Sequence, residues 1–192
     1  MKQMKYLLWG FFALVCVVQV SVIGVQIWSY ERILKEGEVY YFNVLPLDPY
    51  DAFRGRYVTL RFENANKAPT TEKAIKGEGP SKAYAILEHD EASDRIKEVR
   101  YTKPFNEHYL DVNVFPSLKM TTQKTDDAQL VYFSLPFDRF YMREDIAPQA
   151  EKLLRVRSGV KVKAKLRVLD GKGIIEDLRV GETSLSHYVQ GK

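Results

Sequence analysis

Residues 160–180, VKVKAKLRVLDGKGIIEDLRV, contain the clearest strand pattern of the chain. Apolar and basic side chains alternate along the first half, and an Asp-Gly pair separates it from a second apolar half. Alternation with a period of two predicts a strand with one buried face, and the Asp-Gly pair predicts a hairpin. The basic side chains of the opposite face, here called the basic stripe, are Lys161, Lys163, Lys165 and Arg167.

The length of the hairpin loop decides which side chains share a face. A two-residue loop at Asp170-Gly171 would turn Leu178 away from the apolar face of the first strand, whereas an odd-length loop keeps both apolar sets together. We therefore expect a three-residue loop with a left-handed glycine, in place of the type I′ turn that Asp-Gly usually forms. In either odd register, Asp177 lies opposite Lys163 or Lys165.

Shorter segments of the same kind precede the hairpin. Strands are predicted over residues 38–45, 57–62, 82–88, 95–103, 109–115 and 129–135. Residues 64–82 are predicted to be a long loop. A helix is predicted after Asp145, which suits an N-cap, and its apolar stripe consists of Ile146, Ala150, Leu153 and Leu154. The fold class is therefore mainly β (α+β), a small antiparallel sheet or barrel with one packed helix.

The first 30 residues predict a membrane anchor. No charged side chain occurs from Tyr6 to Tyr30, and a helix of this length, about 37 Å, crosses a hydrocarbon core of about 30 Å with some tilt. Lys2 and Lys5 precede this segment, so the positive-inside rule puts the N-terminus in the cytoplasm. A cleaved signal peptide has a shorter apolar region, so we expect a retained anchor. Gln19 and Gln26 share one helix face, where they either bond a partner helix or are simply tolerated.

Four segments follow from these elements. They are a cytoplasmic N-terminus with the transmembrane anchor (1–30), a tether (31–37), an extracytoplasmic β-rich domain (38–188) and a tail (189–192). After residue 30 the chain carries 27 basic and 25 acidic residues, a balance that argues against a nucleic-acid-binding protein. Cys16 is the single cysteine of the sequence, so the outer domain has no disulfide and no thiol chemistry.

A second informative stretch is residues 46–62, PLDPYDAFRGRYVTLRF. A first half rich in Asp and Pro leads into Gly55, Tyr57 and Leu60. This pattern resembles the signature of the GDYXXLXY family of membrane-anchored bacterial proteins. Leu60 is expected in the core together with Val58, because alternate residues of a strand share a face.

Two positions depart from the family signature. Arg56 stands where the signature has Asp, and Phe62 stands where it has Tyr. Residues 138–141 and 163–185 are also similar to family segments, so the resemblance covers most of the outer domain. The resemblance implies a membrane-anchored bacterial protein and suggests a polytopic membrane protein as partner. Together with the orientation from Lys2 and Lys5, it predicts a protein of the bacterial cytoplasmic membrane with the N-terminus inside and the main domain outside. The family name implies no activity.

The candidate ligand or partner loop consists of Asp48, Asp51, Arg54, Gly55 and Tyr57. The same residue types also form turns, because Asp bonds its own backbone, Gly55 supplies an unusual backbone angle and Arg54 can pair with Asp51. Two interpretations of this loop are therefore open: it binds a ligand or partner, or it is a turn with a structural role only.

No catalytic residues, metal site or cofactor are predicted. His89, His108 and His187 are far apart in the sequence, and His89 lies at a predicted polar turn. Ser29 is close to the predicted membrane surface, where signal-peptidase-like enzymes have a serine nucleophile with a lysine base, but it lacks their Met and Pro context. The basic stripe is expected to point to solvent, and the alternatives are that it faces anionic lipid head groups or an acidic partner.

These observations favour a non-catalytic, membrane-anchored extracytoplasmic binding or accessory protein that partners a polytopic membrane protein. The alternative is a membrane-tethered hydrolase or small-ligand sensor that uses the loop from Asp48 to Tyr57. That alternative requires a concave pocket in which an acidic residue of the loop, or Tyr57, meets another polar group.

Overall fold

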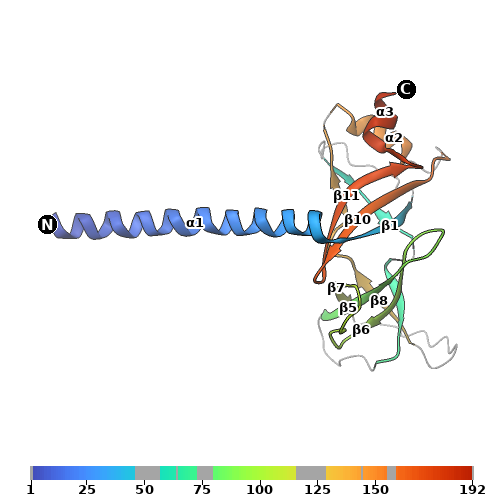
Figure 1. Ribbon diagram of the computed structural model, residues 1–192, viewed down its shortest axis with the longest axis horizontal. Coiled ribbons are helices and arrows are strands. Elements are labelled where there is room, and N and C mark those ends of the chain that lie inside the picture. Colours follow the sequence, from blue (N-terminus) through green and yellow to red (C-terminus); the bar gives the residue numbers. More distant parts are fainter. Residues whose placement is uncertain are drawn as a thin grey trace.

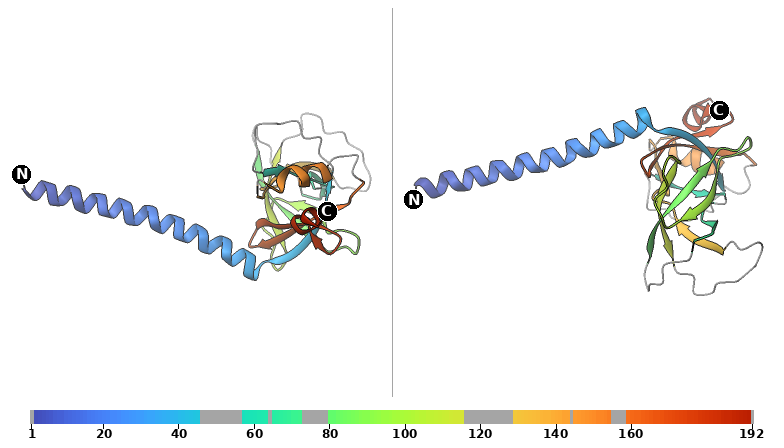
Figure 2. Two further views of the ribbon diagram at one scale, coloured as in Figure 1. Left: turned by 90° about the horizontal axis from the view of Figure 1, so that it is seen from above. Right: turned by 60° about the horizontal axis from the view of Figure 1, so that its bottom comes forward.

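The computed structural model describes residues 2–45, 57–63, 65–72, 80–115, 129–143, 145–154 and 159–191. One long helix leads into a domain of strands with two short helices (Figures 1 and 2). The helices are α1 (Lys2–Glu36), α2 (Ala147–Leu153) and α3 (Leu185–Gln190). The strands are β1 (Glu38–Leu45), β2 (Tyr57–Thr59), β3 (Arg61–Phe62), β4 (Lys67–Thr70), β5 (Ser81–Glu88), β6 (Arg95–Arg100), β7 (Tyr109–Phe115), β8 (Gln129–Ser134), β9 (Arg139–Tyr141), β10 (Val162–Leu169), β11 (Lys172–Val180) and β12 (Thr183–Ser184). The predicted α+β, mainly β fold is thereby confirmed.

Two five-stranded antiparallel sheets form the domain. Sheet I has the strand order β12-β11-β10-β1-β3, and sheet II has the order β4-β8-β7-β5-β6. Strands β2 and β9 form a separate pair. Sheet I adjoins the end of α1. Sheet II lies below sheet I in the view of Figure 1.

Helix α1 runs directly into sheet I without a flexible tether. It continues to Glu36, so residues 31–36, which we predicted as part of a tether, are helical. Ile33 is 5% exposed, and its carbonyl accepts a hydrogen bond from the amide of Gly37 at 2.9 Å. The segment Leu8–Glu36 is long and apolar enough to cross a membrane. The anchor and strand β1 are therefore one continuous packed unit.

The β10–β11 hairpin corrects our prediction of its loop. Asp170 and Gly171 both have positive φ, 51° and 81°, and Leu169 pairs with Lys172, so the loop is a two-residue type I′ turn. A β-bulge, and not the loop, brings the apolar side chains of both strands to the same face. At the bulge Lys165 pairs with Asp177, whereas Leu166 pairs with Ile175. The residue left over is Glu176. One extra residue reverses the facing of everything beyond it.

The consequence of the bulge is the placement of Leu178. It pairs with Ala164, and both residues are fully buried. The expected pairing of Asp177 with a lysine of the basic stripe is confirmed at Lys165. The apolar faces of the two strands therefore coincide as predicted, through a bulge and not through an odd loop.

The predicted strand over residues 57–62 is two strands in different sheets. Tyr57 in β2 pairs with Tyr141 in β9, whereas Phe62 in β3 pairs with Val44 in β1. Between them, Leu60 donates its amide to the carbonyl of Asp138 at 2.7 Å and is 3% exposed. The predicted burial of Leu60 is confirmed, and the side chain holds the crossing segment in the core.

The predicted loop over residues 64–82 contains a strand. Strand β4 pairs with β8 at the edge of sheet II, and its Ala68 and Thr70 are buried. Pro69 is compatible with this position because an edge strand can leave one ladder of hydrogen bonds unmade.

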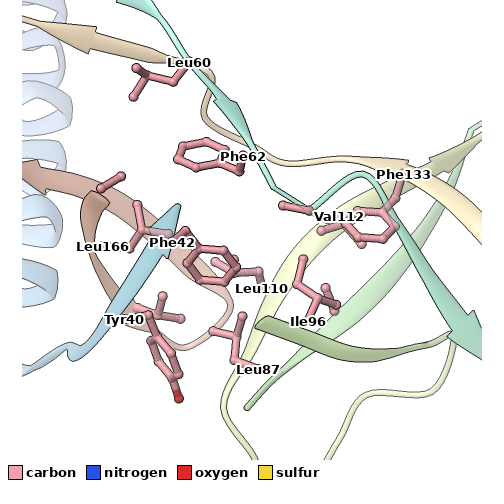
Figure 3. Packing of buried hydrophobic residues seen from close by; sticks show 14 of the residues in the cluster. Tyr40, Phe42, Leu60, Phe62, Leu87, Ile96, Leu110, Val112, Phe133 and Leu166 are labelled. Carbon is pink, nitrogen blue, oxygen red and sulfur yellow. The ribbon is translucent and has the colours of Figure 1, made fainter. Parts of the chain in front are cut away.

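The hydrophobic core lies between the two sheets (Figure 3). Tyr40 and Phe42 of β1 are each 1% exposed, and Leu110 of β7 is fully buried. The ring of Phe62 meets the ring of Phe42 edge to face, with centroids 6.3 Å apart. Other core residues drawn in Figure 3 are Leu87, Ile96, Val112, Phe133 and Leu166.

The two short helices cover one end of the domain, where they contact each other (Figure 1). Helix α2 lies where the apolar stripe predicted it, and Ile146, Ala150 and Leu154 are buried. Helix α3 was not predicted. Its Val189 is 5% exposed within the core, so the packed domain includes a residue that we had assigned to the tail.

Truncation of Leu60 tests whether the signature segment serves the core. Leu60→Ala should lower the free energy of unfolding by about 2–5 kcal/mol, as truncations of buried leucines do. Chemical denaturation of the full chain in detergent measures the difference. The matched control is Leu130→Ala, at a side chain that is 48% exposed. Equal effects of the two substitutions would contradict the placement of Leu60.

Candidate functional site at the anchor junction

A groove of about 560 Å³ lies where α1 meets the domain. One wall is a single face of α1 that includes Val22, Val25, Ser29 and Ile33, residues three or four positions apart. The opposite wall is the β10–β11 turn together with neighbouring residues of the domain. Gln26, which we expected to contact a partner helix or to be merely tolerated, also lines this groove.

Glycines keep the domain wall of the groove close to strand β7. The amide of Asp111 donates to the carbonyl of Gly171 at 2.8 Å. A Cβ atom on Gly171 would lie 2.5 Å from Oδ1 of Asp111, and one on Gly173 would lie 2.6 Å from the ring of Phe137. The turn therefore packs on β7 at positions that have no side chain. The Asp111 carboxylate lines the groove beside the turn.

Two polar contacts join α1 to the turn. Nη2 of Arg32 lies 3.8 Å from Oδ2 of Asp170, and Nζ of Lys172 donates to Oγ of Ser29 at 3.4 Å. Because Lys172 lines the groove and is exposed, its ammonium can also bind an anion there. The groove thus combines an apolar helix face with one acidic and one basic side chain.

Ser29 and Lys172 have the composition of a serine–lysine hydrolase pair, but not its environment. The lysine of such a pair is desolvated in a buried site, whereas Lys172 is exposed. Ser29 lies within α1, whose amides are used by the helix and so do not form an oxyanion hole. The serine hydroxyl and the exposed lysine ammonium are therefore both placed to bind a polar group at the groove.

A second polar cluster lies where β1 meets the ends of β5 and β7. Oε2 of Glu38 is 2.6 Å from Nε2 of His108, and Oε1 is 3.2 Å from Nε2 of His89. The other nitrogen of His89 is 3.0 Å from Oδ1 of Asp94. The His89 ring also stacks on Tyr40, with centroids 4.4 Å apart. Within the described ranges, no group of three or more His, Cys, Asp or Glu side chains is arranged to hold a metal ion.

Carboxylates determine the electrostatics of this junction cluster. Partial burial lowers the pKa of His89, but the hydrogen bonds and charges of Glu38 and Asp94 outweigh it and raise that pKa above the ordinary value. Burial raises the pKa of Tyr40, and the negative charges of Glu38 and Asp94 add to the increase. The cluster therefore favours a positively charged His89 between two carboxylates.

Asp94 connects this cluster to the backbone of sheet I. Its carboxylate is 7% exposed and accepts hydrogen bonds from the amides of Tyr41 at 2.5 Å and Asp90 at 3.2 Å. Its own amide donates to the carbonyl of Tyr41 at 2.9 Å. Asp94 thus joins β1 to the segment before β6 and is a structural acid.

Most of the candidate loop lies outside the described residues. Asp48, Asp51, Arg54 and Gly55 fall within residues 46–56, and only the backbone of Tyr57 is described, in β2. Their roles as a ligand or partner loop therefore remain predictions.

The basic stripe is only partly exposed. Lys165 and Arg167, with side chains 20% and 23% exposed, bind the two carboxylate oxygens of Glu176 at 2.7 Å each. Partial burial raises the pKa of Glu176, but these hydrogen bonds outweigh it and lower that pKa below the ordinary value. Lys161 is exposed, and Lys163 donates to the carbonyl of Ala92 at 2.7 Å. Lys165 and Arg167 are therefore half-buried and paired with Glu176, which the bulge puts beside them, and a binding role of the basic stripe remains a prediction.

Sequence reasoning missed Glu38, Asp94, Asp111 and Lys172. Asp111 occupies a polar position in an alternating strand, and Lys172 follows the predicted turn, so each resembles an ordinary surface residue. The signal that existed was the pair of glycines around Lys172, which indicates close approach of another segment. The residues near Lys172 in the sequence do not indicate that the approaching segments are α1 and β7.

The family comparison covers both the groove and the junction cluster. The family model described as GDYXXLXY protein matches residues 19–178. The chain belongs to the GDYXXLXY family. The matched residues run from within α1 to Leu178 of β11, so they include both walls of the groove. No curated protein and no solved structure matches the chain.

The raised pKa of His89 predicts a pH-dependent contribution to stability. The contribution is fully present below the unfolded-state pKa of about 6.5 and is lost as pH rises through the higher folded-state value. His89→Gln should therefore lower the melting temperature more at pH 5.5 than at pH 8.5. Thermal melts of both chains at the two pH values measure this difference.

His187→Gln is the matched control for this experiment. His187 is an exposed residue of α3, remote in the chain from Glu38 and Asp94. A loss at His89 that is equal at both pH values would contradict the charged state of its imidazole.

Proposed function

We propose that this protein is a non-catalytic accessory protein of the bacterial cytoplasmic membrane that binds a polytopic membrane protein. In this proposal α1 crosses the membrane once with its N-terminus inside, and the two sheets lie outside. Lys2 and Lys5 before the uncharged segment support this orientation through the positive-inside rule. Family membership supports a membrane-anchored protein and adds no activity.

The observation that carries the proposal is an apolar surface on the outer face of sheet II. It consists of Phe115, Leu130 and Tyr132, which are 48%, 48% and 50% exposed. Phe115 pairs directly with Tyr132 across β7 and β8, and Leu130 lies two residues along on the same face. Neighbouring exposed apolar and aromatic side chains are typical of protein contact surfaces.

The packed link between anchor and domain favours a partner in the same membrane. Ile33 is buried, and Nη1 of Arg167 donates to the carbonyl of Gly37 at 3.0 Å. These contacts hold the apolar surface in one orientation to the bilayer. A fixed orientation lowers the entropic cost of meeting a partner that is itself held in the membrane.

Photo-crosslinking from the apolar surface tests the proposal. A photoreactive phenylalanine analogue at position 132 should label a polytopic membrane protein in native membranes, identified by mass spectrometry. The double substitution Leu130→Ser and Tyr132→Ser should reduce recovery of that partner by about tenfold or more, as loss of interface anchors does.

Phe105→Ser is the matched control, since Phe105 is 89% exposed and lies at the opposite end of β7 from Phe115. This control should leave recovery unchanged. Labelling of soluble proteins alone, or equal recovery with the double variant and the control, would contradict the proposed contact.

The alternative function, a hydrolase or small-ligand sensor that uses the loop from Asp48 to Tyr57, predicts a different result. Under our proposal, Asp51→Asn should leave both the melting temperature and partner recovery nearly unchanged. A folded Asp51→Asn chain that loses its partner or its cellular phenotype would make the loop the working surface. Ser29→Ala tests a different hydrolase, one that would use Ser29 and Lys172. Loss of a hydrolytic activity with unchanged folding would support that enzyme and contradict our proposal.

A further inference from the structure

The groove at the anchor junction runs along α1 from the uncharged segment toward the first charged residues of the helix. Its lower part is formed by Val22 and Val25, within the segment that carries no charge. Its upper part reaches Ile33, about 16 Å higher along the helix axis. The first charged residue beyond the uncharged segment is Glu31. The groove therefore crosses the level at which hydrocarbon gives way to head groups.

The charged side chains of the groove, Asp111 and Lys172, both lie on its domain wall, whereas α1 contributes only uncharged side chains, among them Gln26 and Ser29. Lys172 presents an ammonium that already donates to Ser29, and Asp111 presents a carboxylate beside the turn. A ligand that fits this lining needs an apolar part along α1, an anionic group for Lys172 and a cationic group for Asp111.

We propose that this groove binds one phospholipid with a zwitterionic phosphate–amine head group. Its phosphate binds Lys172 and Ser29, its ammonium binds Asp111, and one acyl chain lies along Val22 and Val25. The occupant is therefore a lipid of the leaflet that adjoins the domain. This inference does not depend on the partner proposed above, because Phe115, Leu130 and Tyr132 do not line the groove.

Charge complementarity distinguishes this occupant from an anionic lipid and from a protein segment. A phosphoglycerol head group offers an anion to Lys172 but nothing to pair with the Asp111 carboxylate, which repels it. An apolar transmembrane segment of a partner would fill the apolar part but would bring neither an anionic group to Lys172 nor a cationic group to Asp111. The zwitterionic head group satisfies both charges at once.

Lipid binding to the full-length protein in detergent micelles tests the proposal. The delipidated protein is titrated with a dioleoyl phosphoethanolamine lipid and, separately, with a dioleoyl phosphoglycerol lipid, and native mass spectrometry counts bound molecules. We expect one phosphoethanolamine lipid per chain, bound about tenfold more tightly than the phosphoglycerol lipid, since one charge-assisted contact distinguishes them.

Two substitutions separate the two ends of the head group. Lys172→Gln should weaken both lipids by about tenfold. Asp111→Asn should remove the preference between them and leave phosphoglycerol binding intact or improved. The matched controls are Lys161→Gln and Glu182→Gln, at exposed positions away from the groove, and these should change nothing.

A third variant tests the apolar part without altering any charge. Val25→Trp fills the groove from the α1 side and should remove the bound lipid, and unchanged thermal melts would establish that each variant is folded. Equal retention of both lipids, insensitive to all three substitutions, would overturn the proposal and indicate lipid around the helix only. Crosslinking of a partner's transmembrane segment to position 25 in native membranes, with lipid excluded, would also overturn it.

Discussion

The close backbone contact at Gly37, where α1 ends and β1 begins, sets the geometry of the domain. A side chain at this position would collide with the carbonyl of Ile33 and approach the backbone of Val168, so only glycine lets α1 end against β10 and continue as β1. Arg167 then binds the Gly37 carbonyl from the neighbouring strand. Because β1 lies between β10 and β3 in sheet I, the direction of the anchor and the placement of the sheets are fixed together.

The bulge at Glu176 is the second constraint, and it joins packing to electrostatics. The tight turn at Asp170-Gly171 alone would invert one face of the hairpin, and the extra residue restores it so that Leu178 is buried. The same extra residue sits beside Lys165 and Arg167 as a shared carboxylate. A strand irregularity thus completes the core on one face and neutralises part of the basic stripe on the other.

Two groups of polar side chains lie near the start of β1 and the end of α1. Helix α1 contacts β10 and β11 there, and β1 begins directly after it. Glu38, His89 and Asp94 satisfy one another in the junction cluster. Asp111 and Lys172 instead face an open groove. The first set has an internal electrostatic role, and the second is left available to a ligand.

Features with a local cause can be read from the amino-acid sequence. Uncharged length defines the anchor, alternation defines the strands over residues 38–45 and 109–115, and the spacing of Ile146, Ala150 and Leu154 defines α2. It also identified the family through the signature around Leu60. Tertiary structure alone decided the division of residues 57–62 between two strand pairs, the bulge at Glu176, and the approach of Lys172 to Ser29 across 143 positions. Side-chain alternation specifies which face is buried but not which strand lies opposite, and long-range pairing is what brings the groove and the junction cluster together.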